Sequence, residues 1–227
     1  YQSKAVSSRM TNASMIRGAL KKARLYEKKL ELAAGDYSKY PAYDEKCEAL
    51  LPVLRKEIPL KAHAHQANDI FTALRIAREF DLDITLEHVT EGHLIVEELA
   101  KENVLLAVGP TFCSVSKIEC RNISWKTAGA LANAGCQVSI ITDAPVVPLE
   151  NLPVYAGYAI KAGMDEYDAL RAITICAARH VGVVDRVGSL EEGKDADLVV
   201  MSGCPFTVEG PPRYVFIDGK QIRGAAI

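Results

Sequence analysis

The chain has 227 residues, of which 49% are hydrophobic and 25% are charged, and its formal net charge is −2. This composition is typical of a globular protein with a substantial core, organised in one or two domains. The near-neutral charge argues against nucleic acid or an anionic membrane surface as a partner. The sequence has no apolar run long enough to span a bilayer and no signal-peptide pattern, so no membrane partner is expected.

Six cysteines are scattered along the chain without a C-x-x-C pair. Their spacing does not match a zinc–thiolate motif and indicates reduced, mostly buried thiols rather than a disulfide framework. We therefore expect a cytoplasmic protein. The cysteines are Cys47, Cys113, Cys120, Cys136, Cys176 and Cys204.

The first 58 residues are rich in charge and have the periodicity of helices. Asn12 is the predicted N-cap of a first helix that runs to about Ala34, and Tyr43–Lys56 is a predicted second helix. The apolar stripe expected on the first helix consists of Met15, Ile16, Ala19, Leu20, Ala23 and Leu25. We interpret the charges of this region as solvated helix faces.

From Pro59 onward, short apolar runs alternate with amphipathic segments. The expected strands are Leu60–Ala64, Ile84–Leu86, Val104–Val108 and Gln137–Thr142. The expected helices are Asn68–Phe80 (with Ile70, Phe71, Leu74 and Ala77 inward), Gly92–Glu102, Ser124–Asn133, Asn151–Ala162 and Asp165–Arg179. This alternation predicts an α/β fold with a parallel sheet, either doubly wound or part of a (β/α) barrel. A closed barrel needs eight strand–helix units, and four are visible in this sequence.

After His180 the sequence becomes polar and richer in glycine and proline. Asp197–Met201 is a predicted strand, and Asp218-Gly219 between two apolar runs predicts a β-hairpin. This tail is too short to hold a core of its own, so its strands are expected to pair with strands from elsewhere. We therefore divide the chain into residues 1–182, a barrel portion with leading helices, and residues 183–227, a small β-sandwich portion.

Histidine and aspartate occur at the carboxyl ends of three predicted strands. His63 and His65 end the first strand, His88 ends the second, and Asp143 follows the fourth. Strand parity places His88 and Asp143 on the pocket side and leaves His63 and His65 as alternatives. Parallel α/β folds collect their active sites at this edge. The set predicts a divalent metal site with nitrogen and oxygen ligands, suited to Zn²⁺, Fe²⁺ or Mn²⁺.

Other candidate residues have more ordinary interpretations. A hydrogen-bonded structural histidine is the alternative for any one strand-end imidazole, and it is the interpretation for His93 and His180. Cys113 follows the third strand, where a nucleophile can act, but a buried thiol is favoured. Arg121 and Lys117 near the same strand end are candidates for binding a substrate carboxylate, with solvated loop charges as the alternative. The sequence contains no G-x-G-x-x-G and no P-loop.

Five motifs together resemble one enzyme superfamily. They are His63-Ala64-His65 with Asp69-Ile70, Leu86-Glu87-His88, Thr142-Asp143-Ala144-Pro145, the segment from Ala169 to Thr174, and the tail V-G-S-L-E-E-G-K-D-A-D-L-V-V that starts at Val187. From Pro59 to Gly224 the chain resembles the C-terminal half of the amidohydrolase superfamily, near its imidazolonepropionase and prolidase-like members. The resemblance implies about strands 5–8 of a (β/α)₈ barrel of the TIM type, followed by part of a small β-sandwich.

The resemblance also implies residue roles. It places the metal-binding histidines of the fifth and sixth barrel strands on His63 and His88, and the eighth-strand aspartate on Asp143. His65 is then the second candidate ligand or, with Arg121, a substrate contact. One or two divalent ions are implied, with zinc first and iron or manganese as alternatives. Asp143 would take a proton from a water activated by the metal and pass it to the leaving nitrogen, while His88 binds metal or polarises the carbonyl.

Two family features have no counterpart in this sequence. The first metal motif, a His-x-His, does not occur before Pro59, and no bridging lysine is evident. We therefore expect a fragment of a longer protein that binds metal weakly and does not turn over by itself. The hypothesis is a metal-dependent amidohydrolase that cleaves a C–N bond of a small cyclic amide, amidine or dipeptide-like substrate. The alternatives are a deaminase on the same scaffold and a non-catalytic barrel half for assembly or binding. A homo-oligomer is expected, because an open barrel half exposes strand edges.

Overall fold

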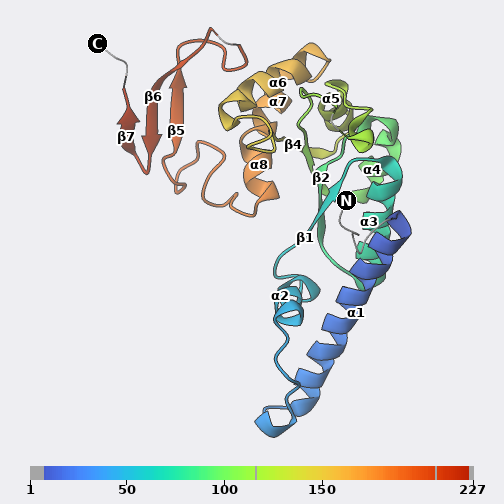
Figure 1. Ribbon diagram of the computed structural model, residues 1–227. Helices are drawn as coiled ribbons and strands as arrows, with labels where there is room; N and C mark the ends of the chain where they lie inside the picture. Colours follow the sequence, from blue (N-terminus) through green and yellow to red (C-terminus); the bar gives the residue numbers. More distant parts are fainter. Residues whose placement is uncertain (1–7, 116, 208, 225–227) are drawn as a thin grey trace. The chain divides into compact units, whose positions relative to one another are not determined.

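The computed structural model describes residues 8–115, 117–207 and 209–224 (Figure 1). The chain forms two compact units: the first consists of Tyr1–Ala62 with Asn68–Ile84, and the second of His63–Ala67 with Thr85–Ile227. The boundary proposed between residues 182 and 183 lies within the second unit and stays a prediction. No helix among the described residues is long and apolar enough to cross a membrane.

The first unit begins with the long helix α1 (Arg9–Ala33). Ser8 is its N-cap, because the Ser8 backbone is extended and its hydroxyl accepts a hydrogen bond of 3.1 Å from the Thr11 N–H. The prediction that Asn12 is the cap is wrong, since Asn12 lies inside the helix. Ala34 ends α1 in the left-handed conformation.

Helix α1 packs against α2 (Glu45–Leu54), and its buried residues are Ala13, Leu20, Ala23, Tyr26 and Ala33. The predicted stripe is correct for Leu20 and Ala23 but wrong for Met15, Ile16, Ala19 and Leu25, which are exposed. Residues 13, 20, 23 and 26 follow the helical spacing of three and seven, and Leu25 lies on the opposite side of the helix from this face. The Tyr26 hydroxyl donates to Glu48 of α2 at 2.5 Å.

Residues 68–80 of helix α3 (Ala67–Phe80) complete the first unit. Their inner face carries Ile70, Leu74, Ile76, Ala77 and Phe80, all buried. The expectation that Phe71 also points inward is wrong, since 38% of it is exposed. Phe71 is rotated by about 100° from Ile70 around the helix, so it lies at the edge of the buried face.

We predict that Leu20→Ala lowers the free energy of unfolding of the first unit by about 2–5 kcal/mol, because Leu20 is almost completely buried in its core. Leu25→Ala in the same helix is the matched control and should change stability by less than about 0.5 kcal/mol, since Leu25 is exposed. Urea unfolding followed by the helical circular-dichroism signal measures both. Equal losses for the two variants would contradict this assignment of the buried face.

The second unit contains most of a four-stranded parallel sheet. The sheet has the order β1 (Leu60–Ala64), β2 (Ile84–His88), β3 (Leu105–Val108) and β4 (Gln137–Ile140). β2 pairs in parallel with β3, and β3 with β4, so that His88 is aligned with Val108 and Ile140. The end of β1 joins this unit where Ala64 O accepts from the Val89 N–H at 3.0 Å. All strand ends that carry the predicted site residues therefore lie along one edge.

Helices connect and cover these strands. They are α4 (Val96–Glu102), α5 (Lys126–Asn133), α6 (Leu152–Lys161), α7 (Glu166–Ala172) and α8 (Ile175–His180). Two segments predicted as single helices are divided: a 3₁₀ turn at Gly92–Leu94 precedes α4, and Thr174 separates α7 from α8 with φ −130° and ψ −98°. The Thr174 hydroxyl donates to Leu170 O at 2.7 Å, a local bond that competes with helix continuation.

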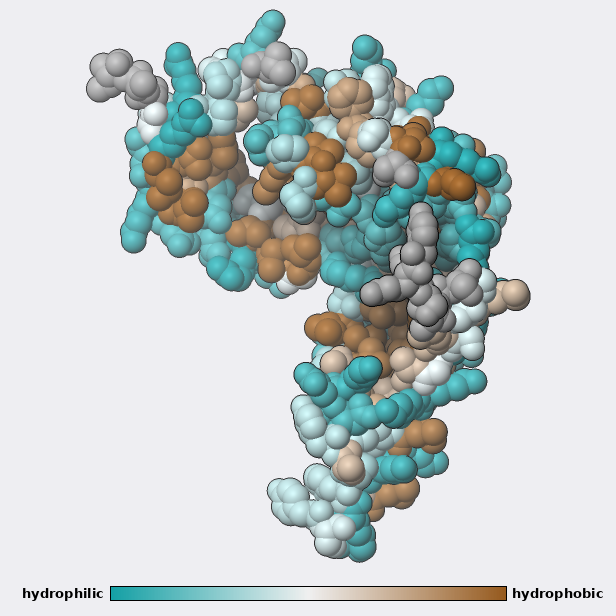
Figure 2. Space-filling view, viewed as in Figure 1, coloured by the Kyte–Doolittle hydropathy of each residue, from teal (hydrophilic) through white to brown (hydrophobic). Residues whose placement is uncertain are grey.

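The tail forms a three-stranded antiparallel sheet of β5 (Leu198–Met201), β6 (Pro212–Ile217) and β7 (Lys220–Arg223). The hairpin predicted at Asp218-Gly219 is confirmed, and both residues have the positive φ that a tight hairpin turn requires (49° and 72°). Figure 2 shows brown, apolar side chains gathered over these strands, where Val199, Ile217 and Ile222 are exposed. This small sheet therefore has an apolar surface, as expected of one layer of a β-sandwich.

Candidate metal centre

Three imidazoles meet at the carboxyl edge of the parallel sheet. His63 and His65 come from the end of β1 and from the residue after it, and His88 is the last residue of β2. Their candidate ligand atoms all lie within 4.8 Å of one another. The ring centroids are 4.1 Å apart for His63 and His88, 4.6 Å for His65 and His88, and 4.8 Å for His63 and His65. The geometry therefore brings both histidines of the H-A-H pair to His88.

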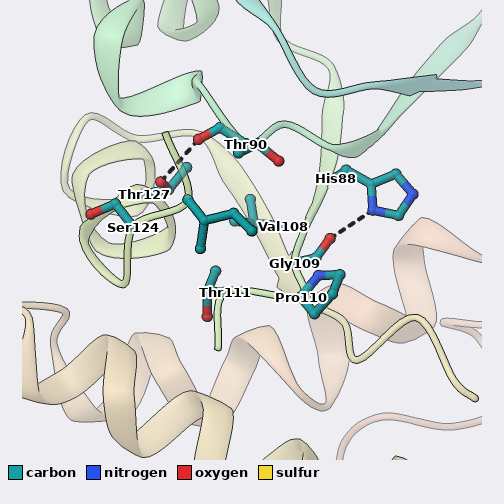
Figure 3. A pocket seen from close by; sticks show the side chains of 9 residues that line it. His88, Thr90, Val108, Gly109, Pro110, Thr111, Ser124 and Thr127 are labelled. Carbon is teal, nitrogen blue, oxygen red and sulfur yellow. Dashed lines mark hydrogen bonds between the residues drawn. The ribbon is translucent and has the colours of Figure 1, made fainter. Parts of the chain in front are cut away.

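His88 is buried and held in one tautomer. Its Nδ1 lies 2.7 Å from the carbonyl oxygen of Gly109, which follows β3 (Figure 3). A carbonyl can only accept, so Nδ1 carries the proton and donates. Nε2 then keeps its lone pair, which is the form that binds a metal. The backbone of His88 has φ +74°, an uncommon value for a residue other than glycine.

His65 is also buried and has a hydroxyl on its Nδ1. The Oγ1 of Thr90 lies 2.7 Å from this atom, and the next residue, Glu91, donates its N–H to His65 O at 2.9 Å. The ring is stacked on His88 with an interplanar angle of 25°. With Nδ1–H donating to Thr90, the Nε2 of His65 is available as a ligand in the same way as that of His88.

Asp143 lies just beyond β4 and is exposed. It has φ +52°, and its carbonyl accepts from the Val146 N–H at 2.8 Å. Among the described residues, Asp143 is outside the group of ligand-type atoms that lie within 4.8 Å. Its charge nevertheless reaches His63, because it acts to raise the pKa of that imidazole. Asp143 is therefore an exposed carboxylate near enough to His63 for its charge to act on that ring.

Burial is the main cause that lowers the pKa values of His63 and His65. Burial lowers the pKa of His63, the charges of His88 and Lys117 act in the same direction, and Glu119 and Asp143 oppose them. Burial, followed by the charges of His88 and His63, lowers the pKa of His65 to about 4. These imidazoles are thus neutral at physiological pH, as metal ligands must be.

The donor set fits a divalent cation. It offers neutral imidazole nitrogens, two of them oriented by Nδ1 contacts to Thr90 and Gly109, and a carboxylate close by. Nitrogen and oxygen donors of this kind suit Zn²⁺, Fe²⁺ and Mn²⁺. The choice of His63 over His65 as a ligand stays a prediction, because both rings belong to the cluster.

The loop after β3 places charged residues of both signs near His65. Glu119 Oε1 lies 4.0 Å from His65 Nε2 and 3.7 Å from Lys117 Nζ, and Cys120 Sγ lies 3.7 Å from His65 Nδ1. Arg121 is exposed at the end of the turn Ile118–Cys120. Lys117 is thus the basic residue whose charge acts on His63 and His65, and a role for Arg121 stays a prediction.

Two other predicted residues have the environments expected of structural groups. His93 Nδ1 lies 2.8 Å from Thr127 Oγ1, and His180 Nε2 lies 2.8 Å from Glu87 Oε1.

Burial raises the pKa of the Cys113 thiol, and the charge of Asp143 adds to the effect. A thiol with a raised pKa is a poor nucleophile at neutral pH. Cys113 is only partly buried, however, and Cys47 alone of the six cysteines is buried, so the prediction of mostly buried thiols is wrong.

Sequence reasoning missed the residues that orient the imidazoles, namely Thr90, Glu91 and the Gly109 carbonyl. Each lies within three residues of the end of a strand, close to the histidines themselves, so position was the only available signal. A shallow pocket lies beside His88, and its wall includes Thr90, Gly109, Thr111 and Ser124 (Figure 3). The orienting residues therefore also shape the space next to the cluster.

Comparison with known proteins agrees with this geometry. Residues 33–222 match the amidohydrolase family. The chain belongs to this family. An amidohydrolase from Thermotoga maritima has a similar structure, with a TM-score of 0.90 and 40% identity over 95% of this chain and 56% of that one. A prolidase complexed with N-methylphosphonate-L-proline has a TM-score of 0.60 and 17% identity over 80% of this chain and 50% of that one, which shows the fold alone.

Two curated amidohydrolase relatives match shorter shares of their own length. Amidohydrolase tasK of Hapsidospora irregularis is 28% identical over 197 residues, which are 83% of this chain and 20% of that protein. The imidazolonepropionase of Symbiobacterium thermophilum is 33% identical over 151 residues, which are 63% of this chain and 33% of that protein. The chain thus spans a fifth to a third of these relatives and about half of the two structures. The predicted half of an amidohydrolase barrel with a small second sheet is confirmed.

We predict that the metal-free amidohydrolase chain becomes less stable as the pH falls from 6.5 towards 4. In this window the unfolded chain takes up a proton at His65, whose folded pKa is about 4, so stability is fully present above pH 6.5 and is lost on acidification. Urea midpoints at a series of pH values between 4 and 7.5 measure the slope. His65→Asn should flatten it, and a wild-type midpoint that is constant from pH 7 to 4.5 would contradict the assignment.

Proposed function

We propose that the protein containing this chain is a metal-dependent hydrolase that cleaves a C–N bond in a cyclic amide, amidine or dipeptide-like substrate. The cluster of His63, His65 and His88 within 4.8 Å at the sheet edge is the observation that carries the proposal. Membership of the amidohydrolase family supports it. The names of the relatives, which include an imidazolonepropionase and a prolidase, support the substrate class.

His63, His88 and Asp143 would hold the cation, with His65 as a further ligand or a substrate contact. Zinc is the first candidate, with iron or manganese as alternatives, and one or two ions are compatible with the proposal. When bound, a divalent cation supplies Lewis acidity, which polarises an oxygen and makes a water molecule more acidic. The Gly109 carbonyl fixes the tautomer of His88, so its Nε2 meets the cation without a proton.

Asp143 is the proposed general base and acid. Its carboxylate is exposed beyond β4 and acts on His63, so a water attacking from the open side of the cluster would meet it. In hydrolysis Asp143 takes a proton from the water as the oxygen bonds to the carbonyl or ring carbon. It then gives this proton to the nitrogen as the C–N bond breaks, and it returns to the carboxylate form.

Basic residues of the loop after β3 are proposed to bind an anionic group of the substrate. Lys117 is the better placed, since its charge acts on His63 and His65 and its ammonium lies 3.7 Å from Glu119. Arg121, exposed at the end of the same turn, is the second candidate. A substrate with a carboxylate near the scissile bond would fit this arrangement.

We predict that the natural full-length protein binds zinc and that His88→Ala weakens its zinc affinity by more than about 100-fold. Removal of a direct ligand should exceed the 10–100-fold loss typical of a residue that only orients a ligand. His93→Ala is the matched control, because His93 contacts Thr127 rather than the cluster. Competition titration with a zinc chelator measures both. Equal zinc affinity in the wild type and His88→Ala would rule out this site.

We predict that Asp143→Asn lowers kcat about 10²–10⁴-fold in the full-length protein while zinc remains bound, since the amide cannot accept the proton. Asp185→Asn, at an exposed position away from the cluster, is the control and should keep full activity. Assays on a panel of cyclic amides, amidines and dipeptides supply the rates. Release of ammonia with each turnover would assign a deaminase instead, and no turnover by the zinc-loaded protein would favour the non-catalytic alternative.

A further inference from the structure

Glu91 is a buried carboxylate that the proposed reaction does not use. It follows β2 by three residues and is only 7% exposed. Both of its oxygens accept hydrogen bonds: Oε2 from the Ala67 N–H at 2.9 Å and Oε1 from Asn122 Nδ2 at 2.7 Å. A buried charge is costly unless such bonds satisfy it. The position of Glu91 between three chain segments therefore requires an explanation.

Glu91 makes a hydrogen bond at each end of the turn that follows His65. Its N–H donates to the carbonyl of His65 at 2.9 Å, and its carboxylate accepts from the N–H of Ala67, the first residue of α3. Only Gln66 lies between these two contacts. The preceding residue, Thr90, places its hydroxyl on the His65 ring. The segment after His88 thus fixes both the backbone and the ring of His65.

The second oxygen of Glu91 ties in the loop after β3. Asn122 is two residues from Cys120, whose Sγ lies 3.7 Å from His65 Nδ1, and three from Glu119, whose Oε1 lies 4.0 Å from His65 Nε2. This loop covers the edge of the His65 ring. One carboxylate consequently holds the turn that carries His65 and the loop that lies over it.

The observed bonds are those of a carboxylate. Both partners of the Glu91 side chain are donors, so both of its terminal oxygens accept. A glutamine has the same shape but offers one acceptor and one donor, so it can keep both bonds only when the Asn122 amide turns over and presents Oδ1 to its NH₂. Asp, shorter by one methylene, cannot span the same two partners. The partial positive charge at the start of α3 adds to the preference for an anion.

We propose that Glu91 is a positioning residue for the imidazole cluster, acting through the His65 turn and the loop that bears Asn122. The metal-binding readout of this role rests on the proposed function. Glu91 touches neither the reacting atoms nor the cation, and it keeps the His65 ring in place beside His63 and His88.

The test exchanges the donor and the acceptor of the Glu91–Asn122 hydrogen bond in the full-length protein. In Glu91→Gln with Asn122→Asp, Gln Oε1 accepts from the Ala67 N–H and Gln NH₂ donates to the new aspartate, so each contact is restored. Asn122→Asp alone sets two carboxylates against each other and should weaken Zn²⁺ binding by about 10–100-fold. Glu91→Gln alone should have a smaller effect, because the Asn122 amide can turn over and accept from the Gln NH₂. The double variant should return to within about threefold of the wild type. Glu98→Gln, exposed on α4, is the matched control and should leave binding unchanged.

Two measurements are made on each variant: Zn²⁺ affinity by chelator competition, and the visible spectrum with Co²⁺, which reports the geometry of the nitrogen ligands. A shifted Co²⁺ spectrum in Asn122→Asp that returns in the double variant supports positioning. Zinc binding and a Co²⁺ spectrum equal to the wild type in Asn122→Asp overturn it. A double variant that folds, judged by its thermal midpoint, but still binds zinc tenfold more weakly also overturns it, even where a single variant does not fold.

Failure of the proposed function gives a different result. A wild-type protein that binds no divalent cation refutes the metal site itself, whatever Glu91 does. Crystal structures of the variants then test positioning: the His65 ring and Cys120 should be displaced in Asn122→Asp and return in the double variant. Unchanged positions in Asn122→Asp would overturn the role of Glu91.

Discussion

The close packing of three imidazoles is the constraint on which the site depends. Parallel pairing of β2, β3 and β4 aligns their carboxyl ends, and the end of β1 adds the H-A-H pair beside His88. Burial and the neighbouring imidazoles lower the pKa values of His63 and His65, since a positive charge on either ring would lie against another ring. The arrangement therefore favours neutral His63 and His65 and suits a cation that the rings can share.

Hydrogen bonds from the loops orient the packed imidazole rings. The carbonyl of Gly109 fixes one tautomer, the hydroxyl of Thr90 holds another ring, and Glu91 secures the turn beneath it. The backbone at His88 and Asp143 has positive φ, which is uncommon for these residues. Such conformations persist when surrounding contacts hold them, and they concentrate at functional positions. The sheet brings the imidazoles together, and the loop residues set the orientation of their rings.

The sequence predicted the features that follow from periodicity. Strand–helix alternation and strand-end polarity identified the sheet and the edge that carries His63, His65 and His88. The N-cap of α1 and its exposed face were mispredicted, because several polar residues near Ser8 can cap and because apolar spacing alone does not reveal which face finds a partner. Thr90 and Glu91 were missed because their role comes from contacts with segments 24 to 31 residues away.

Exposure divides the site into a back and a front. His65 and His88 are buried and hydrogen-bonded by Thr90 and Gly109, while His63 and Asp143 are exposed. A group that must hold its orientation benefits from the buried position, where few rotamers are open to it. A group that exchanges protons with water and substrate needs the exposed one. The role proposed for Asp143 agrees with this division, because Asp143 lies outside the tight cluster, acts on His63 and is exposed, which leaves room for an incoming water.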